Sequence, residues 1–226
     1  MQVDRQILIT SLLLLGSILF FEFSYLDIDI QDLFYNSQNN AWILPKYSEP
    51  YHFIFYTFAR KIPLLFLLAI LVLLIFYKNY PLVKTYKKGL MIVMFSIIFV
   101  PSITVGIKNS SNIPCPKHLI NYEGKYPHIA VWEKYKVPYS RLKPVHCWPA
   151  GHASGGFALL SLFFLFKKPR YKRLALTLAL IAGWSMGSYK ILIGDHFFSH
   201  TLITMLLAWL IILVIVKLTD RWLPPT

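Results

Sequence analysis

Three histidines stand at the starts of two apolar runs. His152 lies in a glycine-rich turn, Trp148–Gly156, and His196 and His200 open the last apolar run of the chain. The unpaired N–H groups at a helix start favour phosphate oxygens. An imidazole can donate a proton near neutral pH, and it can attack phosphorus if an acceptor holds its other ring nitrogen. These residue types predict phosphoryl chemistry shared by the two histidine groups.

His196 is the predicted nucleophile, His200 its partner and His152 the general acid. Positions i and i+4 share one face of a helix, so the ring of His200 is placed to hold that of His196. The same spacing also suits two metal ligands. The zinc protease motif has a glutamate directly after its first histidine, and Phe197 stands there instead. A metal site is therefore disfavoured.

Lys108 and Lys190 are the candidate phosphate-binding cations. Each lies at the end of an apolar run, and an ammonium group there can neutralise charge that shifts on a phosphate in the transition state. Taken singly, a polar residue in a helical membrane protein is more often an interfacial or packing residue. The prediction therefore depends on whether the chain brings these side chains to one place.

The composition indicates what must position them. The chain is 56% hydrophobic and 15% charged, with a mean hydropathy of +0.53, whereas soluble domains carry about 25% charged residues. It has 23 Lys and Arg against 10 Asp and Glu. This composition favours a basic integral membrane protein. The charge reflects either contact with anionic headgroups and phosphorylated substrates or cation-rich cytoplasmic loops.

Six apolar runs are long enough, or nearly so, to span a bilayer, which takes about 17–25 residues. They are Ile7–Leu26, Ile62–Tyr77, Gly89–Ile107, Gly151–Phe166, Leu174–Ile193 and Phe197–Val216. The second and fourth are short. No small-residue cleavage site follows the first, which is expected to be a retained helix. The predicted fold is an all-α integral membrane bundle of six transmembrane helices in a single domain, residues 1–226.

Short cation-rich loops indicate the orientation. Lys78–Lys88 holds four cations, Lys167–Arg173 holds five, and neither contains an acid. The positive-inside rule places both loops, and hence both termini, in the cytoplasm. Ionisable groups within membrane helices are costly and usually functional. Counting spans brings four such side chains to the outer, periplasmic face: Lys108, His152, Lys190 and His196.

Two outer segments connect the spans. Asp27–Arg60 is expected to be either an interfacial amphipathic helix or a plain connecting loop. The periplasmic loop at residues 108–148 carries seven cations against only Glu123 and Glu133. This charge either attracts an anionic substrate or belongs to an ordinary solvated loop. The loop also holds three histidines that are expected to be exposed: His118, His128 and His146.

Three motifs resemble those of the type 2 phosphatidic acid phosphatase superfamily, which read Lys-x6-Arg-Pro, Pro-Ser-Gly-His and Ser-Arg-x5-His-x3-Asp. The corresponding segments here are Lys108-x6-Cys115-Pro116, Pro149-Ala150-Gly151-His152 and Tyr189-Lys190-x5-His196-x3-His200. Their order and internal spacing match, and the resemblance covers about Gly89–Val216, so that residues 89–216 would form the phosphatase core. The combination is much more specific than any one motif.

The resemblance implies a helical bundle, usually of six membrane helices, and a role for each matched residue. His196 would form a phosphohistidine, and His152 would protonate the leaving group. Gly151 would offer a backbone N–H to the phosphate, which Lys108 and Lys190 would also bind. The family needs no metal for hydrolysis, and no cofactor is expected.

Three matched positions differ from the family pattern. Cys115 stands where the family has arginine and brings no cation, so that a basic loop residue would have to substitute for it. Lys190 also replaces an arginine, and lysine lacks the bidentate fork. His200 replaces the aspartate that orients the nucleophile, and a neutral imidazole does not stabilise an imidazolium as a carboxylate does. Asp195, adjacent to His196, ranks second for that role.

The two cysteines of the chain, Cys115 and Cys147, both lie in the outer loop beside a motif. In an oxidising periplasm a bridge between them is reasonable, and two free thiols are the alternative. Closing a loop of about 30 residues stabilises a fold by roughly 3–4 kcal/mol in the chain-entropy model. We expect such a bridge to clamp the first motif to the second.

The resulting hypothesis is a metal-independent phosphatase in a bacterial inner membrane. Its expected partners are the bilayer and a phosphorylated lipid, without nucleic acid. By family analogy lipid A is the leading substrate, with undecaprenyl diphosphate and phosphatidylglycerophosphate as rivals, and a second lipid is an alternative acceptor to water. A hypothesis of another class is a non-enzymatic transporter or scaffold with a degenerate site. These alternatives, and the oligomeric state, stay open at the level of sequence.

Overall fold

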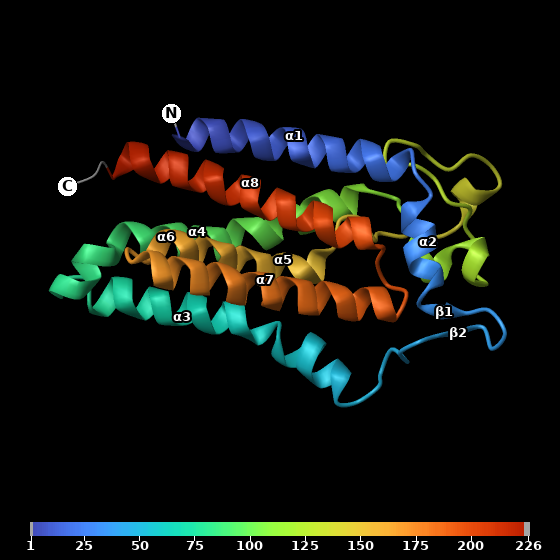
Figure 1. The fold of residues 1–226 in the computed structure, drawn as a ribbon, viewed down its shortest axis with the longest axis horizontal. Helices are drawn as coiled ribbons and strands as arrows, with labels where there is room; N and C mark the ends of the chain where they lie inside the picture. Colours follow the sequence, from blue (N-terminus) through green and yellow to red (C-terminus); the bar gives the residue numbers. More distant parts are fainter. Residues whose placement is uncertain (1, 224–226) are drawn as a thin grey trace.

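Long helices lying side by side form the body of the protein (Figure 1). The computed structural model describes residues 2–223. Within them the chain is nearly all α-helical, with a single short hairpin of two strands. The long helices are α1 (Gln2–Glu22), α3 (Lys61–Phe76), α4 (Pro81–Ser110), α7 (Pro169–Leu192) and α8 (Phe198–Trp222). This arrangement confirms the predicted helical class.

Five of the six predicted spans are helices that are long and apolar enough to cross a membrane. The second begins earlier than predicted, because a π-helical segment, η1 (Phe53–Phe58), leads into α3 and extends the candidate span to Phe53–Phe76. The predicted span at Gly151–Phe166 is a shorter apolar segment, Gly151–Leu165. It divides into α5 (Gly151–Ala158), η5 (Leu159–Ser161) and α6 (Leu162–Leu165). Whether this sixth segment crosses a bilayer stays a prediction.

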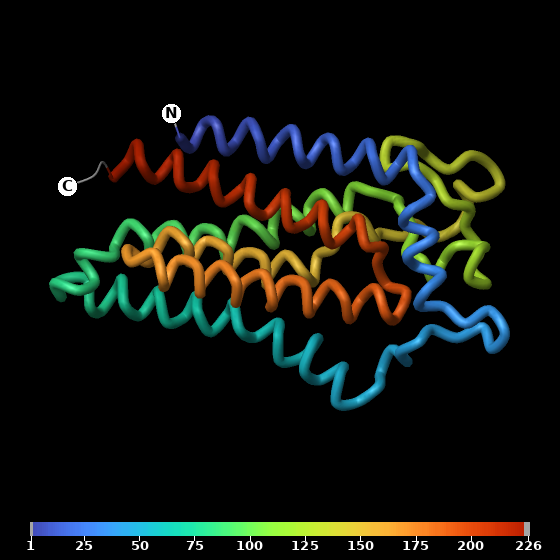
Figure 2. The backbone as a smooth tube through the Cα atoms, in the orientation of Figure 1, coloured from blue at the N-terminus to red at the C-terminus, as the bar shows by residue number. Residues whose placement is uncertain are grey.

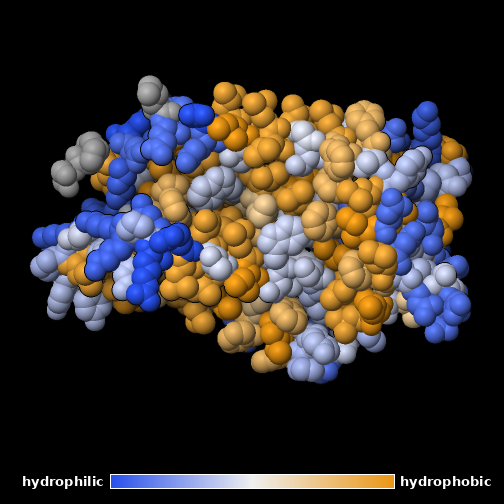
Figure 3. Space-filling model, viewed as in Figure 1, coloured by the Kyte–Doolittle hydropathy of each residue, from blue (hydrophilic) through white to orange (hydrophobic). Residues whose placement is uncertain are grey.

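The connections gather at the two ends of the bundle. The tube in Figure 2 places the start of α1, the end of α8 and the two cation-rich connections at one end. The long segments around residues 23–60 and 111–150, together with the α7–α8 connection, lie at the other end. Between them, one face of the molecule is a broad apolar band (Figure 3). The described ends of α1 and α8 and both cation-rich connections therefore lie at the end of the bundle opposite the long connections, and the side of a membrane that each end faces stays a prediction.

The short helix α5 is at the centre of the bundle, in contact with α4, α7 and α8. Phe157 on α5 is fully buried. A Cβ built on Gly156 would lie only 2.7 Å from the Cα of Gly183 on α7. Membrane helices commonly pack through small residues in this way. This close contact brings the start of α5 and the end of α7 together.

The predicted Asp27–Arg60 connection is neither one amphipathic helix nor a plain loop. It contains a short helix, α2 (Leu26–Asp32), a two-stranded hairpin, β1 (Tyr35–Asn36) and β2 (Ala41–Trp42), and then η1. Trp42 packs directly on Gly194, in the connection between α7 and α8, where a Cβ would lie 2.3 Å from the indole. Gly194 also has a φ of +71°, a conformation that side chains disfavour. The hairpin thus covers the turn that precedes His196.

Asp27 on α2 caps the N-terminus of α8. Its Oδ1 accepts a hydrogen bond of 2.9 Å from the backbone N–H of Ser199, in the first turn of that helix. Four residues on, Gln31 donates from Nε2 to the carbonyl oxygen of Ile191 in the last turn of α7, at 3.0 Å. The short helix therefore binds both sides of the α7–α8 corner.

Replacing Asp27 with asparagine is expected to change how thermal stability depends on pH. Burial raises the pKa of Asp27 from 3.8 to about 6, against the opposing effect of its hydrogen bonds to Ser199. The folded protein then holds this proton more tightly than the unfolded chain. The stabilisation that the protonated carboxyl group of Asp27 gives to the fold is fully present below pH 3.8 and is lost as the pH rises through about 6. Asparagine keeps the acceptor oxygen and does not ionise, so the Tm of Asp27→Asn should fall less over that interval.

Thermal unfolding of the purified protein in detergent between pH 4 and 8 measures this difference. Asp29→Asn, on the exposed side of the same helix, is the matched control and should follow the wild type. Asp27→Ala removes the cap and should cost about 1 kcal/mol. Parallel curves of Tm against pH for the wild type and Asp27→Asn would contradict the assignment.

Candidate active site

The last turn of α7 places His196 beside the residues that precede it. The N–H of Gly194 bonds to the carbonyl of Ile191 at 3.0 Å, and the N–H of Asp195 bonds to that of Lys190 at 2.8 Å. With Gly194 at positive φ, this is a Schellman C-cap. His196 follows it, and its own N–H also reaches the carbonyl of Lys190, at 3.2 Å. The cap turns the chain back so that His196 lies close to the end of α7.

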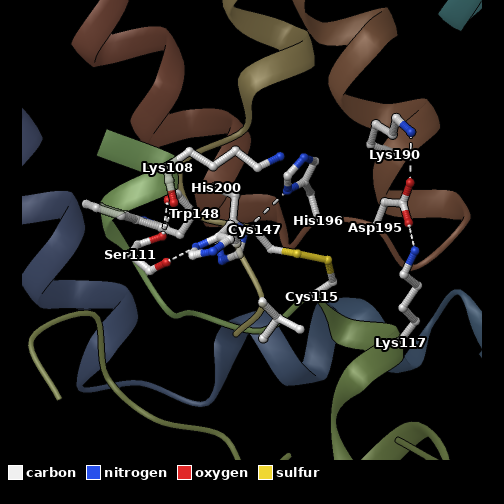
Figure 4. The surroundings of a disulfide bond; sticks show 12 residues. Lys108, Ser111, Cys115, Lys117, Cys147, Trp148, Lys190, Asp195, His196 and His200 are labelled. Carbon is white, nitrogen blue, oxygen red and sulfur yellow. Dashed lines mark hydrogen bonds and ion pairs between the residues drawn. A yellow bond between two sulfur atoms is a disulfide. The ribbon is translucent and has the colours of Figure 1, made fainter. Parts of the chain in front are cut away.

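His196 and His200 form a buried pair. Helix α8 begins at Phe198, so His196 lies just before the helix rather than within its first turn, and His200 is inside it. Each side chain is only 3% exposed, and the two Nδ1 atoms are 3.4 Å apart. Figure 4 shows this contact as a dashed line. The Nε2 atom of His196 is the nitrogen that this contact leaves unused.

The surroundings of His196 keep its ring neutral. Burial lowers the pKa of His196 well below 6.5, and the neighbouring His200 and Lys108 lower it further. The ring of His200 also has a hydrogen bond to the backbone of Cys147. A backbone carbonyl there accepts a hydrogen bond from one ring nitrogen of His200, and in the neutral tautomer this leaves Nδ1 free to accept from His196. This tautomer pattern suits a neutral imidazole that is oriented by a second imidazole.

Three ammonium groups and one carboxylate lie beside this pair. Lys190 is only 6% exposed, and its Nζ is 2.8 Å from Oδ2 of Asp195. The other carboxylate oxygen binds Nζ of Lys117, from the segment after α4. Lys108, in the last turn of α4, extends toward His196 (Figure 4). Burial would raise the pKa of Asp195, but Lys190 and Lys117 hold it below its usual value, so the carboxyl is ionised.

His152 stands at the start of α5, directly after Gly151. The turn before it is held to α8, because the N–H of Ala150 donates to Oγ1 of Thr204 at 2.8 Å. Tyr56 of η1 lies against the imidazole of His152, with ring centroids 4.7 Å apart. The same tyrosine ring has the ammonium of Lys190 4.6 Å from its centroid. Tyr56 therefore positions the general-acid candidate and a phosphate-binding candidate together.

The cysteines form a disulfide, Cys115–Cys147, across a sequence separation of 32 residues (Figure 4). It connects the segment after α4 to the turn before α5. Additional bonds reinforce this link, because Ser111 donates to the carbonyl of Trp148 at 2.7 Å. The sulfur atoms and a ring nitrogen of His118 lie within 4.8 Å of one another. The disulfide leaves no thiolate there to bind a metal.

One cavity of about 370 Å³ collects most of the predicted site. Lys108, His152, Lys190 and His196 all line it, together with both cysteines. His200, which contacts His196, does not line the cavity. Gly151 lines an adjoining cavity, which shares Lys108 and His152 with the first. Of the loop histidines that were expected to be exposed, His128 and His146 are exposed, whereas His118 is half-buried.

Two charged lining residues, Lys117 and Asp195, were not among the catalytic or phosphate-binding residues chosen from the sequence. Lys117 follows Cys115 by two positions, and only the loss of the arginine at that motif hinted that a loop cation was needed. Asp195 was considered as a partner of His196, but its carboxylate oxygens bind Lys117 and Lys190 instead. This carboxylate holds the two ammonium groups together at the cavity wall, and each ammonium keeps donors that the pairing does not use.

The comparison with protein families agrees with this geometry. The model of the PAP2 superfamily matches residues 89–224, more than half of the chain. No match was found among curated proteins or among solved structures. The matched region begins in α4 and contains every residue that lines the cavity described above. The chain belongs to the PAP2 superfamily, whose members are phosphatases that act on phosphate esters.

Proposed function

We propose that this protein hydrolyses a phosphate ester of a membrane lipid through a phosphohistidine on His196. One observation carries the proposal: a single cavity is lined by His196, His152 and the two matched lysines, Lys108 and Lys190. Superfamily membership supports the phosphatase activity. The apolar helices support a substrate that resides in the bilayer.

The first step transfers the phosphoryl group to the enzyme. Nε2 of His196 attacks phosphorus while the bond from phosphorus to the ester oxygen breaks, and His152 gives that oxygen its proton. His200 accepts the hydrogen bond from Nδ1 of His196 and so keeps the attacking nitrogen directed at the cavity. Lys108 and Lys190 compensate the charge on the phosphoryl oxygens as it shifts in the transition state.

The second step releases phosphate. Water attacks the phosphohistidine from the position that the alcohol has left, and the bond between phosphorus and Nε2 breaks. His152, neutral after the first step, removes a proton from this water. His196 and His152 return to their starting protonation states, so the two steps balance in protons and electrons without a metal or a redox cofactor. A lipid hydroxyl in place of water would give phosphotransfer instead.

The adjoining cavity supports a lipid as the substrate. It has a volume of about 520 Å³ and shares Lys108 and His152 with the cavity that His196 lines. An ester whose phosphate lies at His196 can place its hydrocarbon portion there. Most of the apolar side chains that line it come from α3 and α4, and one comes from α7: Pro63, Leu64, Leu67, Ile97, Pro101, Val105 and Met186.

The proposed setting is a bacterial inner membrane, with the site facing the periplasm. The cation-rich connections at the opposite end of the bundle support this orientation, and the disulfide suits an oxidising compartment. Lipid A is the preferred substrate among the lipid phosphates, because the basic residues of the loop at 108–148 would attract a large anionic headgroup. Undecaprenyl diphosphate and phosphatidylglycerophosphate are the other candidates.

Phosphate release from purified protein tests the function. The protein in detergent, with a chelator present, is incubated with lipid A, undecaprenyl diphosphate or phosphatidylglycerophosphate, and inorganic phosphate is measured. Mass spectrometry of lipids from cells with and without the protein identifies the natural substrate by the loss of one phosphate. Release from none of these lipids, together with unchanged cellular lipids, would favour the transporter or scaffold alternative.

A further inference from the structure

Lys117 is held against the α7–α8 corner at two points. Its backbone N–H donates to the carbonyl of Gly194 at 3.0 Å. Its Nζ forms an ion pair with Oδ1 of Asp195. Two residues earlier, Cys115 is fixed by the disulfide to Cys147. A lysine on a surface loop is usually free to sample many conformers, so this attachment places the ammonium group at a defined point on the cavity wall.

With Lys117, the formal charge of the cavity comes closer to the charge that balances a phosphomonoester dianion. Lys108, Lys117 and Lys190 each contribute a positive charge, and Asp195 contributes one negative charge. Before His152 takes up the proton that it later donates, with the cavity histidines neutral, these groups leave a formal charge of about +2, which matches the −1.5 to −2 of a phosphomonoester at neutral pH. Without Lys117 the formal charge falls to about +1, and the dianion is left under-compensated.

We propose that Lys117 binds the substrate phosphate, in place of the arginine that the superfamily pattern has at the position of Cys115. The inference rests on the proposed function, because it assigns a further residue to the same site. An ammonium group has three N–H donors. The pair with Asp195 occupies one donor of Lys117, and the other two remain available to phosphate oxygens in the cavity.

A role limited to structure makes different predictions. If Lys117 only neutralised Asp195, its loss would weaken anion binding solely through the uncompensated carboxylate, and the loss would disappear in a background of Asp195→Asn. The effect on stability is expected to be small in any case, since Lys190 remains 2.8 Å from the same carboxylate. Affinity for a phosphate analogue, measured for Lys117→Met with and without Asp195→Asn, separates the two roles, because only a phosphate-binding lysine still matters once the carboxylate is gone.

The experiment measures binding of orthovanadate to the full-length protein in detergent, by calorimetry and by inhibition of phosphate release. Loss of one charge-assisted hydrogen bond should weaken vanadate binding of Lys117→Met by about 10- to 100-fold, with a matching rise in KM. Lys117→Arg keeps the cation and should stay within about threefold of the wild type. Lys125→Met, an exposed lysine of the same loop, is the matched control and should bind as the wild type does.

Each outcome decides one question. Wild-type vanadate affinity in Lys117→Met, a loss of affinity that disappears in the background of Asp195→Asn, or no vanadate binding by the wild type, would overturn the assignment of Lys117. A loss of affinity in Lys117→Met that persists in that background and that Lys117→Arg restores supports it. If vanadate binding depends on Lys117 but no lipid phosphate is hydrolysed, the anion site stands and the proposed function fails. If lipid phosphate is hydrolysed and Lys117→Met is fully active, the function stands and this inference fails.

Discussion

Replacing His196 with alanine is expected to reduce phosphate release by at least about 10³-fold, because the variant has no atom that can accept the phosphoryl group. The remaining cations can still bind phosphate. Affinity for vanadate should therefore fall much less than turnover does. Steady-state release from the lipid substrate, measured beside vanadate binding, separates these two quantities.

The covalent intermediate provides a direct test of the same residue. Protein mixed with ³²P-labelled substrate and quenched within a turnover should carry label that is stable to alkali and labile to acid, as expected of a phosphoramidate. The label should map to the peptide that contains His196. His128→Ala, in an exposed part of the loop, is the control and should be labelled like the wild type. Full activity of His196→Ala would refute the assignment of the nucleophile.

The body of the fold was predictable because hydrophobicity is a local property. Runs of apolar residues identify α1, α4, α7 and α8, but polar first or last turns extend the helices beyond the runs: α4 begins at Pro81 rather than Gly89, and α8 ends at Trp222 rather than Val216. The predicted run Ile62–Tyr77 matches α3 (Lys61–Phe76) closely, but the candidate span begins earlier, at Phe53, because the π-helical segment before α3 continues its apolar character. Counting the helices from one cation-rich connection to the next was then sufficient to predict that four side chains lie at one end of the bundle: Lys108, His152, Lys190 and His196.

The parts that position the site were not predictable in the same way. Lys117 meets Asp195 across a separation of 78 residues, and Asp27 meets Ser199 across 172. Such contacts depend on how irregular connections fold over the bundle, and no periodic pattern encodes them. Gly194 is a partial exception, because a glycine just after a helix that contains Lys190 in its last turn is a readable C-cap signal.

His200 shows why a departure from a family pattern needs geometry to be interpreted. Its Nδ1 is attached to Cγ, as the carboxylate oxygens of an aspartate are, so either side chain presents an acceptor at the same number of bonds from the backbone. With Nδ1 only 3.4 Å from that of His196, the imidazole occupies the place of the missing carboxylate. In the mechanism proposed above it orients the nucleophile, but it adds no negative charge to stabilise an imidazolium.

The kcat of variants at His200 is therefore expected to depend on whether the new side chain offers a hydrogen-bond acceptor and a negative charge. His200→Ala removes the acceptor and should lower kcat by about 10²-fold, the usual scale for a residue that holds a functional imidazole. KM should change little, because His200 does not line the cavity. His200→Asn keeps an oxygen on Cγ, and its kcat should lie between those of His200→Ala and the wild type. His200→Asp adds a negative charge, and its kcat should equal or exceed that of the wild type.

The pH profile distinguishes this orienting role from a packing role. In the wild type, burial together with His200 and Lys108 lowers the pKa of His196, so the protonation of His196 that stops attack should occur below pH 6.5. A carboxylate at position 200 favours the charged imidazole and raises that pKa. The acid limb of kcat against pH should therefore move to higher pH in His200→Asp and not in His200→Asn. An acid limb that is identical in both variants, with equal loss of activity, would mean that His200 serves packing alone.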